Sequence, residues 1–157
     1  MKLDEIDYKI LDILQENGRI TNVQLSQQVG LSPAPTLERV RKLENSEFIE
    51  SYHALLNAQR LGLNVTVFAE VTLGPGEVKK QEAFLADMQR HREVVECYRI
   101  TGEYDFLLKI FATDIAGYQT FIMNHIVGDP HGGKVSSKIV LATPKRTLSL
   151  PIPVAEE

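Results

Sequence analysis

The chain has 157 residues, of which 43% are hydrophobic and 24% are charged, and its net charge is −4 at pH 7. This composition is ordinary for a globular protein. The negative net charge excludes the class of strongly basic nucleic-acid-binding proteins, so any DNA contact must use a local basic patch. The single cysteine excludes an intramolecular disulfide. The start is acidic, unlike a secretory signal, and no apolar run approaches the roughly 20 residues of a membrane span, so we expect a cytoplasmic protein with no membrane partner.

Two amphipathic helices are predicted at the start of the chain. Over residues 3–16, apolar side chains recur at helical spacing, acidic residues are enriched early, and an Asn-Gly pair ends the helix. Thr21 then caps a short second helix, because Gln24 lies three residues further on, as a capping box requires. Gly30 ends this second helix.

A third helix is predicted to begin at Pro33, directly after the N-cap residue Ser32. Its buried face is expected to consist of Leu37, Val40 and Leu43, with basic residues on the outer face. Only one residue separates the end of the second helix from this cap, so the two helices must cross at a large angle, as in a helix-turn-helix. Periodicity alone leaves open a small three-helix bundle with no role on DNA.

The periodicity changes in the second part of the chain. Residues 51–56 are interpreted as a strand or wing, and residues 57–63 as a connector. Alternating apolar residues then predict four strands, and helical spacing predicts two helices. Their order is strand, helix, strand, strand, helix, strand, over residues 65–73, 77–91, 93–101, 104–111, 115–126 and 135–142.

This order is that of the ferredoxin-like βαββαβ fold. The expected fold class is therefore α+β, with two domains joined by a short connection. We expect a winged-helix-like helix-turn-helix domain over residues 1–52, a strand and linker over 53–63, and a ferredoxin-like domain over 64–157.

Both faces of the predicted sheet have large apolar residues. In the first predicted strand, Phe68 and Val67 face opposite sides of the sheet. In the third, Leu107 and Phe111 face one side and Phe106 and Leu108 face the other. Two helices cover only one face of a four-stranded sheet, so the other face is expected to be covered by a partner. The simplest partner is a second copy, which predicts a homodimer.

Four stretches resemble the leucine-responsive regulatory protein/AsnC family, the feast/famine regulators: LDEIDYKILDILQENGRIT, GLSPAPTLERVRKLE, IESYHALLN and TGEYDFLLK. The resemblance implies a DNA-binding transcription regulator whose second domain binds a small-molecule effector, most simply an amino acid. It also implies dimers that often assemble into octamers. The family usually has Gly before the apolar pair that follows the third helix. Glu47 stands there in this chain, so the left-handed turn at the helix end is expected to be lost.

Candidate contacts to double-stranded DNA cluster on the third helix. Basic side chains in its middle are expected to meet phosphates, and side chains of its first turns are expected to lie nearest the base edges. Thr21 and Ser32 could also donate to phosphate, although both serve equally well as caps. A surface ion pair with Glu38, Glu44 or Asp12 is the alternative for Arg39 and Arg41. The full candidate set is Thr21, Ser32, Pro33, Ala34, Thr36, Glu38, Arg39, Arg41 and Lys42.

Candidate effector contacts lie in a loop between two predicted strands. An α-amino acid needs N–H donors for its carboxylate and an acceptor for its ammonium group, which Gly102 and Asp105 could supply. The resemblance implies that this is the effector loop. A plain hairpin turn, with Asp105 capping its own backbone, is the alternative. The candidate set is Thr101, Gly102, Glu103, Tyr104 and Asp105, with Ser136 and Ser137 on the last strand.

Catalysis, a metal and a cofactor are not expected. The four histidines have no ligand spacing with Cys97, and there is no phosphate-binding glycine loop or nucleophile elbow. Two alternatives to an effector-controlled regulator stay open. One is an architectural DNA-binding protein without an effector, and the other is a small enzyme or metabolite-binding regulatory subunit that uses only the ferredoxin-like domain.

Overall fold

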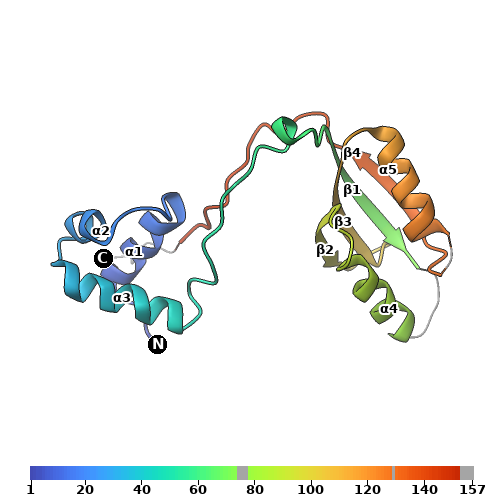
Figure 1. The fold of residues 1–157 in the computed structure, drawn as a ribbon. Helices are drawn as coiled ribbons and strands as arrows, with labels where there is room; N and C mark the ends of the chain where they lie inside the picture. The colour runs from blue at the N-terminus through green and yellow to red at the C-terminus, as the bar shows by residue number, and fades with distance from the viewer. Residues whose placement is uncertain (74–77, 129, 153–157) are drawn as a thin grey trace. The chain divides into compact units, whose positions relative to one another are not determined.

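The computed structural model describes residues 1–73, 78–128 and 130–152. The chain divides into two compact units (Figure 1). The first unit joins Met1–Leu55 to the C-terminal segment from Lys145, and the second is Leu56–Pro144. The expected domain of residues 64–157 therefore differs from the observed unit at its C-terminal end, because the tail packs with the N-terminal helices.

The first unit contains the three expected helices, α1 (Glu5–Glu16), α2 (Asn22–Val29) and α3 (Pro33–Asn45). Local capping sets the start of the first two. The backbone N–H of Asp7 donates to the Asp4 side chain and the N–H of Asp4 donates back to Asp7, and Thr21 and Gln24 form the same reciprocal box. Each box pairs two N–H groups that a helix start would otherwise leave without acceptors.

The helices of this unit meet in a small core of Ile10, Leu25, Val29 and Leu43. One predicted core position is wrong: Leu37 is 39% exposed, and Thr36 is fully buried in its place. The buried stripe of α3 runs through positions 36, 40 and 43, which are spaced by four and three residues. Leu37 lies one residue, about 100°, away from that stripe and faces outward.

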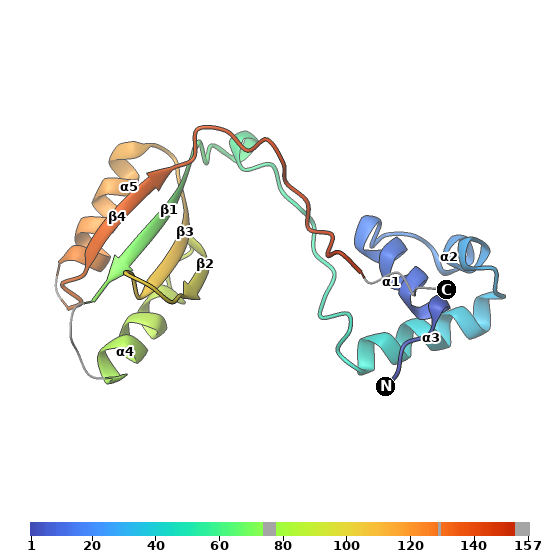
Figure 2. The same cartoon turned by 180° about the vertical axis from the view of Figure 1, so that it is seen from behind.

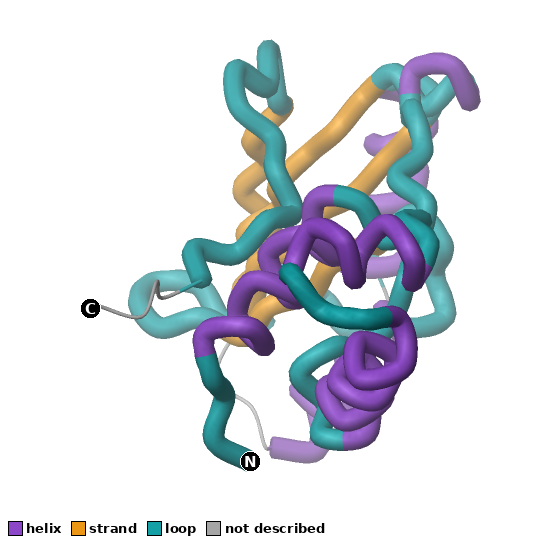
Figure 3. The backbone as a smooth tube through the Cα atoms, turned by 90° about the vertical axis from the view of Figure 1, so that its left-hand side faces the viewer, coloured by secondary structure: helices purple, strands orange, loops and turns teal. Residues whose placement is uncertain are grey.

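The predicted strand over residues 51–56 is not formed. Residues 50–57 have no regular secondary structure and are drawn as loop in Figure 3, and a short 3₁₀ turn follows at Gln59–Leu61. A strand needs a hydrogen-bonded neighbour, and the described part of this single chain provides none for the segment. Its apolar residues Leu55 and Leu56 are 58% and 64% exposed.

The second unit has the expected βαββαβ order, and the predicted α+β class is confirmed. Its strands form one antiparallel sheet in the order β2-β3-β1-β4, which Figures 1 and 2 show from opposite sides. The elements are β1 (Val65–Thr72), α4 (Val78–Met88), β2 (Val94–Arg99), β3 (Phe106–Ala112), α5 (Ile115–Ile122), a π-helical turn (Met123–Val127) and β4 (Lys134–Ile139).

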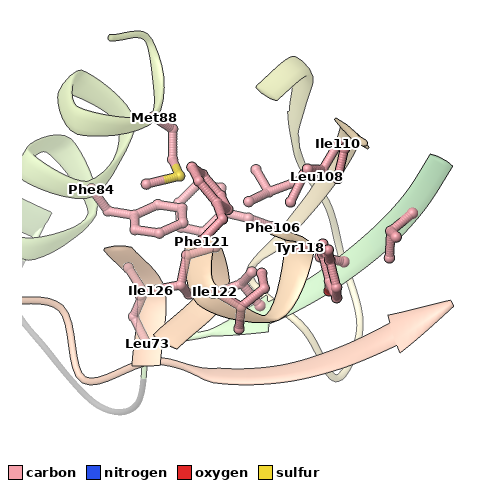
Figure 4. Close-up of a cluster of buried hydrophobic side chains, with 14 residues drawn as sticks. Leu73, Phe84, Met88, Phe106, Leu108, Ile110, Tyr118, Phe121, Ile122 and Ile126 are labelled. Carbon is pink, nitrogen blue, oxygen red and sulfur yellow. The ribbon is translucent and has the colours of Figure 1, made fainter. Parts of the chain in front are cut away.

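Both helices pack on the same face of the sheet. Alternate residues of β1 and β3 are buried, and they contact Phe84 and Met88 of α4 and Tyr118, Phe121 and Ile126 of α5 and the π turn (Figure 4). The alternation follows from the pleat, which turns successive side chains to opposite faces. The other residues of these strands form what we call the outer face of the sheet.

The outer face is mixed, whereas the sequence predicted an apolar surface. Phe68, Leu107 and Phe111 are half-buried on it. Two ion pairs lie among them: Lys109 Nζ is 2.7 Å from Glu96 Oε1, and Lys138 Nζ is 2.9 Å from Glu70 Oε2. The face therefore has apolar side chains interleaved with charged pairs that bridge neighbouring strands.

Candidate nucleic-acid interface and effector site

The outward side of α3 presents a continuous exposed surface. Pro33, Ala34, Glu38, Arg41 and Lys42 are all exposed. No ion pair is formed by Arg41 or Lys42 within the part of the chain that the structure describes. Two free cations beside small and acidic side chains suit contact with phosphates and base edges.

The turn between α2 and α3 holds the start of this surface in place. The Asn22 side-chain amide donates to the Pro33 carbonyl oxygen at 2.7 Å, which ties the first turns of the two helices together. Gly30 adopts a left-handed conformation (φ 74°) at the end of α2, where a residue without Cβ pays no steric penalty. The entry to α3 is thus set by the turn.

The two predicted cap residues differ in availability. The Thr21 hydroxyl is engaged with Gln24 in the capping box of α2. Ser32 makes no side-chain cap bond, although its backbone carbonyl accepts from the Thr36 hydroxyl at 3.0 Å. Of the two hydroxyl groups, that of Ser32 is therefore the one left for an external partner.

Thr36 does not lie on the exposed outward side of α3. Its side chain is fully buried and bonded to the preceding turn of its own helix. The prediction placed it near the base edges because it lies in the first turns of α3. The helical rotation instead directs position 36 into the core, so its side chain cannot reach a base.

Arg39 forms an ion pair, but not with the carboxylates considered from the sequence. Its Nη1 donates to Asp4 Oδ2 at 2.8 Å and to Asp7 Oδ1 at 2.7 Å, which clamps α3 to the start of α1. The backbone N–H of Asp7, followed by the Arg39 guanidinium, lowers the pKa of Asp4, and the two carboxylates raise the pKa of Arg39. Arg39 is thus engaged inside the unit, unlike its neighbours Arg41 and Lys42.

The left-handed turn after α3 is retained in spite of the missing glycine. Glu47 has φ 59° and is the one described non-glycine residue with a positive φ. Phe48 N–H donates to the Leu43 carbonyl and Glu47 N–H to the Glu44 carbonyl, the two bonds of a Schellman motif. The expected loss of this turn was wrong, because these bonds and the burial of Leu43 hold the helix end.

In the second unit, the predicted effector loop lies between β2 and β3. Thr101, Gly102 and Glu103 are exposed, and Gly102 has φ 115°, which a residue with a side chain rarely adopts. Asp105 does not cap its own turn: its Oδ2 accepts from the backbone N–H of Leu73 at 2.9 Å. The loop therefore offers exposed backbone, with its carboxylate anchored to the end of β1.

Ser136 and Ser137 point to opposite faces of β4, so they cannot both line one site. Ser137 shares a hydrogen bond with the Tyr118 hydroxyl on the helix side. Ser136 lies on the outer face, where its hydroxyl accepts from Lys138 Nζ at 2.6 Å. The structure therefore separates the two serines that the prediction joined.

Lys138 and Glu70 are polar residues near the loop that the sequence reading missed. The Glu70 hydrogen bond raises the pKa of Lys138, and the Glu103 carboxylate acts in the same direction. An exposed ammonium group near an exposed loop can bind a carboxylate. The alternation of β4 could have indicated Lys138, since it shares its parity with Ser136.

Three of the four histidines, His91, His125 and His131, lie on or beside the helices of the second unit, and His53 lies in the irregular segment before that unit. His131 is buried and bonded to Asp87 at 2.9 Å, which lowers the pKa of Asp87, and His91 and His125 have ring centroids 4.2 Å apart. In the residues that the structure describes, no three His, Cys, Asp or Glu side chains are arranged to hold a metal. In the same residues, no helix has the length and apolarity to cross a membrane.

Both units match known families. Residues 3–50 match a winged helix-turn-helix DNA-binding model, and residues 66–150 match the Lrp/AsnC ligand binding domain.

Three full-length similarities agree with these matches. The chain is 38% identical to the transcriptional regulator AzlB of Bacillus subtilis over 96% of both chains. It is 41% identical to the leucine-responsive regulatory protein of Salmonella typhimurium, over 96% of this chain and 92% of that one. A crystal structure of a transcriptional regulator from Neisseria meningitidis in complex with L-Met superimposes with a TM-score of 0.90, at 39% identity, over 96% of this chain and 97% of that chain.

Proposed function

Since the chain belongs to the Lrp/AsnC family of DNA-binding transcription regulators, we propose that α3 reads duplex DNA and that an amino acid bound near the 101–105 loop modulates this binding. The observation that carries the proposal is the exposed side of α3, with Arg41 and Lys42 free of ion pairs in the described residues. The similar proteins are transcriptional regulators, a class that binds DNA rather than converting a substrate.

On DNA, the residues of α3 divide by reach and charge. Arg41 and Lys42 contact phosphates, which position the helix without reading sequence, and Ser32 adds a hydroxyl contact that Thr21, engaged with Gln24, does not. Ala34 meets a thymine methyl group, Glu38 accepts from a cytosine amino group, and Pro33 packs at the same entry. Thr36 and Arg39 are left out of this contact set, because the first is buried and the second is held by two carboxylates.

For the effector, the loop and the outer face supply complementary groups. The exposed backbone from Thr101 to Glu103 approaches the ligand closely, with Tyr104 beside it and Asp105 able to accept from an ammonium group. Lys138 attracts the carboxylate. The Neisseria meningitidis relative crystallised with L-Met supports an amino acid as the ligand class.

Assembly links the two activities. The outer face of the sheet pairs two chains, and dimers associate further into an octamer as the family resemblance implies. Two copies of α3 then engage two half-sites, and ligand binding at a contact between dimers alters their spacing. A regulator built this way differs from an architectural protein because its DNA affinity depends on the amino acid.

Gel-shift titrations on duplex DNA from the protein's own upstream region test the DNA interface. Arg41→Ala should weaken binding to all sequences and reduce the salt slope by about one, the value for one lost phosphate contact. Arg39→Ala is the matched control, and its salt slope should equal that of the unmodified protein. Absence of duplex binding at low salt would contradict the proposed function.

A thermal-shift screen of the twenty amino acids tests the effector site, because a ligand that binds only the folded state raises its stability. The stabilising amino acid should lose its effect in Gly102→Val, in which a side chain is added at φ 115°. No shift with any amino acid would favour the architectural alternative.

A further inference from the structure

The C-terminal tail returns to the DNA-binding unit. After β4 the chain leaves the sheet, and residues 148–150 lie against the last turn of α1 (Figures 1 and 2). Contacts with a separation of 133 to 135 residues join the two segments. Unit one is therefore built from both ends of the chain.

The contact is directed at the backbone of the tail. The Gln15 side chain accepts from Leu150 N–H at 2.8 Å and donates to the Leu150 carbonyl at 3.1 Å, as a neighbouring strand would. The Ser149 hydroxyl adds a bond of 2.9 Å to Glu16. The Gln15 amide also donates to Asp12 one turn earlier at 3.1 Å, which orients it before the tail arrives.

The contacts that the structure records between residues 148–150 and α1 are hydrogen bonds. Leu148 and Leu150 are 70% and 73% exposed, so their side chains add little apolar burial. Water competes readily for exposed hydrogen bonds, so a contact that consists of only a few of them is weak and reversible. The prolines at 144 and 151 restrict the tail to extended conformations, which lowers the entropy lost on docking.

We propose that the last turn of α1, centred on Gln15, is a docking site for residues 148–150 of the same chain and that the docked tail acts as a strap. The chain crosses between the units twice, after Leu55 and before Lys145. The second crossing leads directly from β4, the strand of Ser136 and Lys138, to α1. The strap couples the ligand-binding unit to the helix-turn-helix. This coupling role rests on the proposed function, whereas the docking itself does not.

Hydrogen exchange of the full-length protein tests the docking. The Leu150 amide should be protected, and Gln15→Ala should speed its exchange by about tenfold or more. Gln27→Ala is the matched control, because Gln27 is an exposed helical glutamine of the same unit whose side chain makes no hydrogen bond in the described residues. An unprotected Leu150 amide, or equal exchange in Gln15→Ala, would overturn the docking.

A disulfide trap identifies the chain that supplies the tail. Glu16→Cys combined with Ser149→Cys, in a Cys97→Ser background, places thiols at contacting side chains. Oxidation should give an intrachain bond and a monomer band on a denaturing gel. A covalent dimer would show that the tail docks on a second copy and would overturn the assignment to one chain.

Gel-shift titrations with and without L-leucine or L-methionine test the coupling. The ratio of the DNA affinity with amino acid to that without it should move at least fivefold closer to one in Gln15→Ala, because fivefold is the lower end of ordinary coupling between sites. The DNA affinity in the absence of amino acid should not change. An unchanged ratio despite faster Leu150 exchange would refute the strap. Failure of the unmodified protein to bind DNA or respond to either amino acid would instead contradict the proposed function, leaving the exchange result as the test of docking.

Discussion

Glu47 shows how one residue can hold an unfavourable conformation. Its positive φ places Cβ near a carbonyl oxygen, a strain on the order of 1–2 kcal/mol for a non-glycine residue. The two Schellman bonds and the anchoring of Leu43 in the core repay this strain. A negative charge at the C-terminal end of α3 adds a second small penalty, because the helix dipole is negative there.

Glu47→Gly should therefore stabilise the protein by about 1 kcal/mol, after allowing for the greater freedom of glycine in the unfolded chain. Urea denaturation followed by circular dichroism measures the change. Glu47→Gln removes the charge and keeps the strain, so it should give only a few tenths of that gain. Ser46→Gly, at an ordinary φ of −96°, should destabilise. Destabilisation by Glu47→Gly would show that this φ is not strained.

Arg39 is a structural residue at the same scale. Removing it leaves the Asp7 carboxylate, whose side chain is 7% exposed, without its charged partner. Arg39→Ala should cost about 2 kcal/mol in urea denaturation, the worth of hydrogen bonds to a charged group. Arg41→Ala, which breaks no ion pair in the described residues, should stay within about 0.5 kcal/mol. Equal effects of the two substitutions would contradict the clamp.

The same cluster predicts an acid dependence. The pKa of Asp4 is lowered in the folded state by the Asp7 backbone N–H and by Arg39, so folding favours the ionised carboxylate. This contribution is complete above the ordinary aspartate pKa of about 4 and is lost as pH falls through the lower folded value. Below about pH 4, the free energy of unfolding should therefore fall less in Asp4→Asn than in the unmodified protein, because the variant has no carboxylate at this position to protonate.

At the scale of elements, the end of α5 is closed by its glycine. The helix widens into the π turn Met123–Val127, and Gly128 N–H donates to the Met123 carbonyl at 3.0 Å. A Cβ on Gly128 would lie 2.7 Å from that same backbone oxygen, closer than real Cβ atoms approach. The turn leads toward β4, so its geometry positions the strand of Ser136 and Lys138.

Gly128→Ala should destabilise the protein by about 2 kcal/mol, because the clash is with backbone that cannot move aside freely. Gly117→Ala in α5 is the matched control. Its Cβ would meet the Asp114 side chain at an ordinary 3.4 Å, so better helix propensity should stabilise by about 0.5 kcal/mol. Thermal and urea unfolding of both variants measure the difference, and a neutral Gly128→Ala would rule out the close approach.

At the scale of the whole molecule, we propose that the outer face of the sheet mediates assembly. Phe68, Leu107 and Phe111 lie among the ion pairs Lys109–Glu96 and Lys138–Glu70. Two copies of this face, related by a two-fold axis, would complement each other. Each apolar patch would meet its copy, and the charged side chains of both signs could pair across the axis.

Leu107→Asp should raise the dimer dissociation constant at least tenfold in sedimentation equilibrium, because it places an unpaired charge in the apolar part of the interface. Thr66→Arg, at an outward polar position of β1, provides a second variant that leaves the core untouched. Thr120→Asp on the exposed side of α5 is the control and should not alter dimer formation. Dimers of unchanged stability in both outer-face variants would place the interface elsewhere.

The sequence by itself determined the order of helices and strands, the α+β class and the family. Capping boxes at Asp4 and Thr21, helical spacing and strand alternation involve residues within a few positions of one another, so they can be read along the chain. The effector loop and the exposed residues of α3 were predicted in the same way, from local chemistry and the family motifs.

Only the tertiary structure decided which partners those residues have. Arg39 finds its carboxylates 32 and 35 positions away, and Gln15 holds a backbone 135 positions away, so no local pattern records either contact. The rotation of α3 about its axis, which buries Thr36 and exposes Leu37, is set by packing against α1 and α2. Local propensity fixes where elements begin and end, whereas burial and charge pairing across the fold fix what each side chain is free to do.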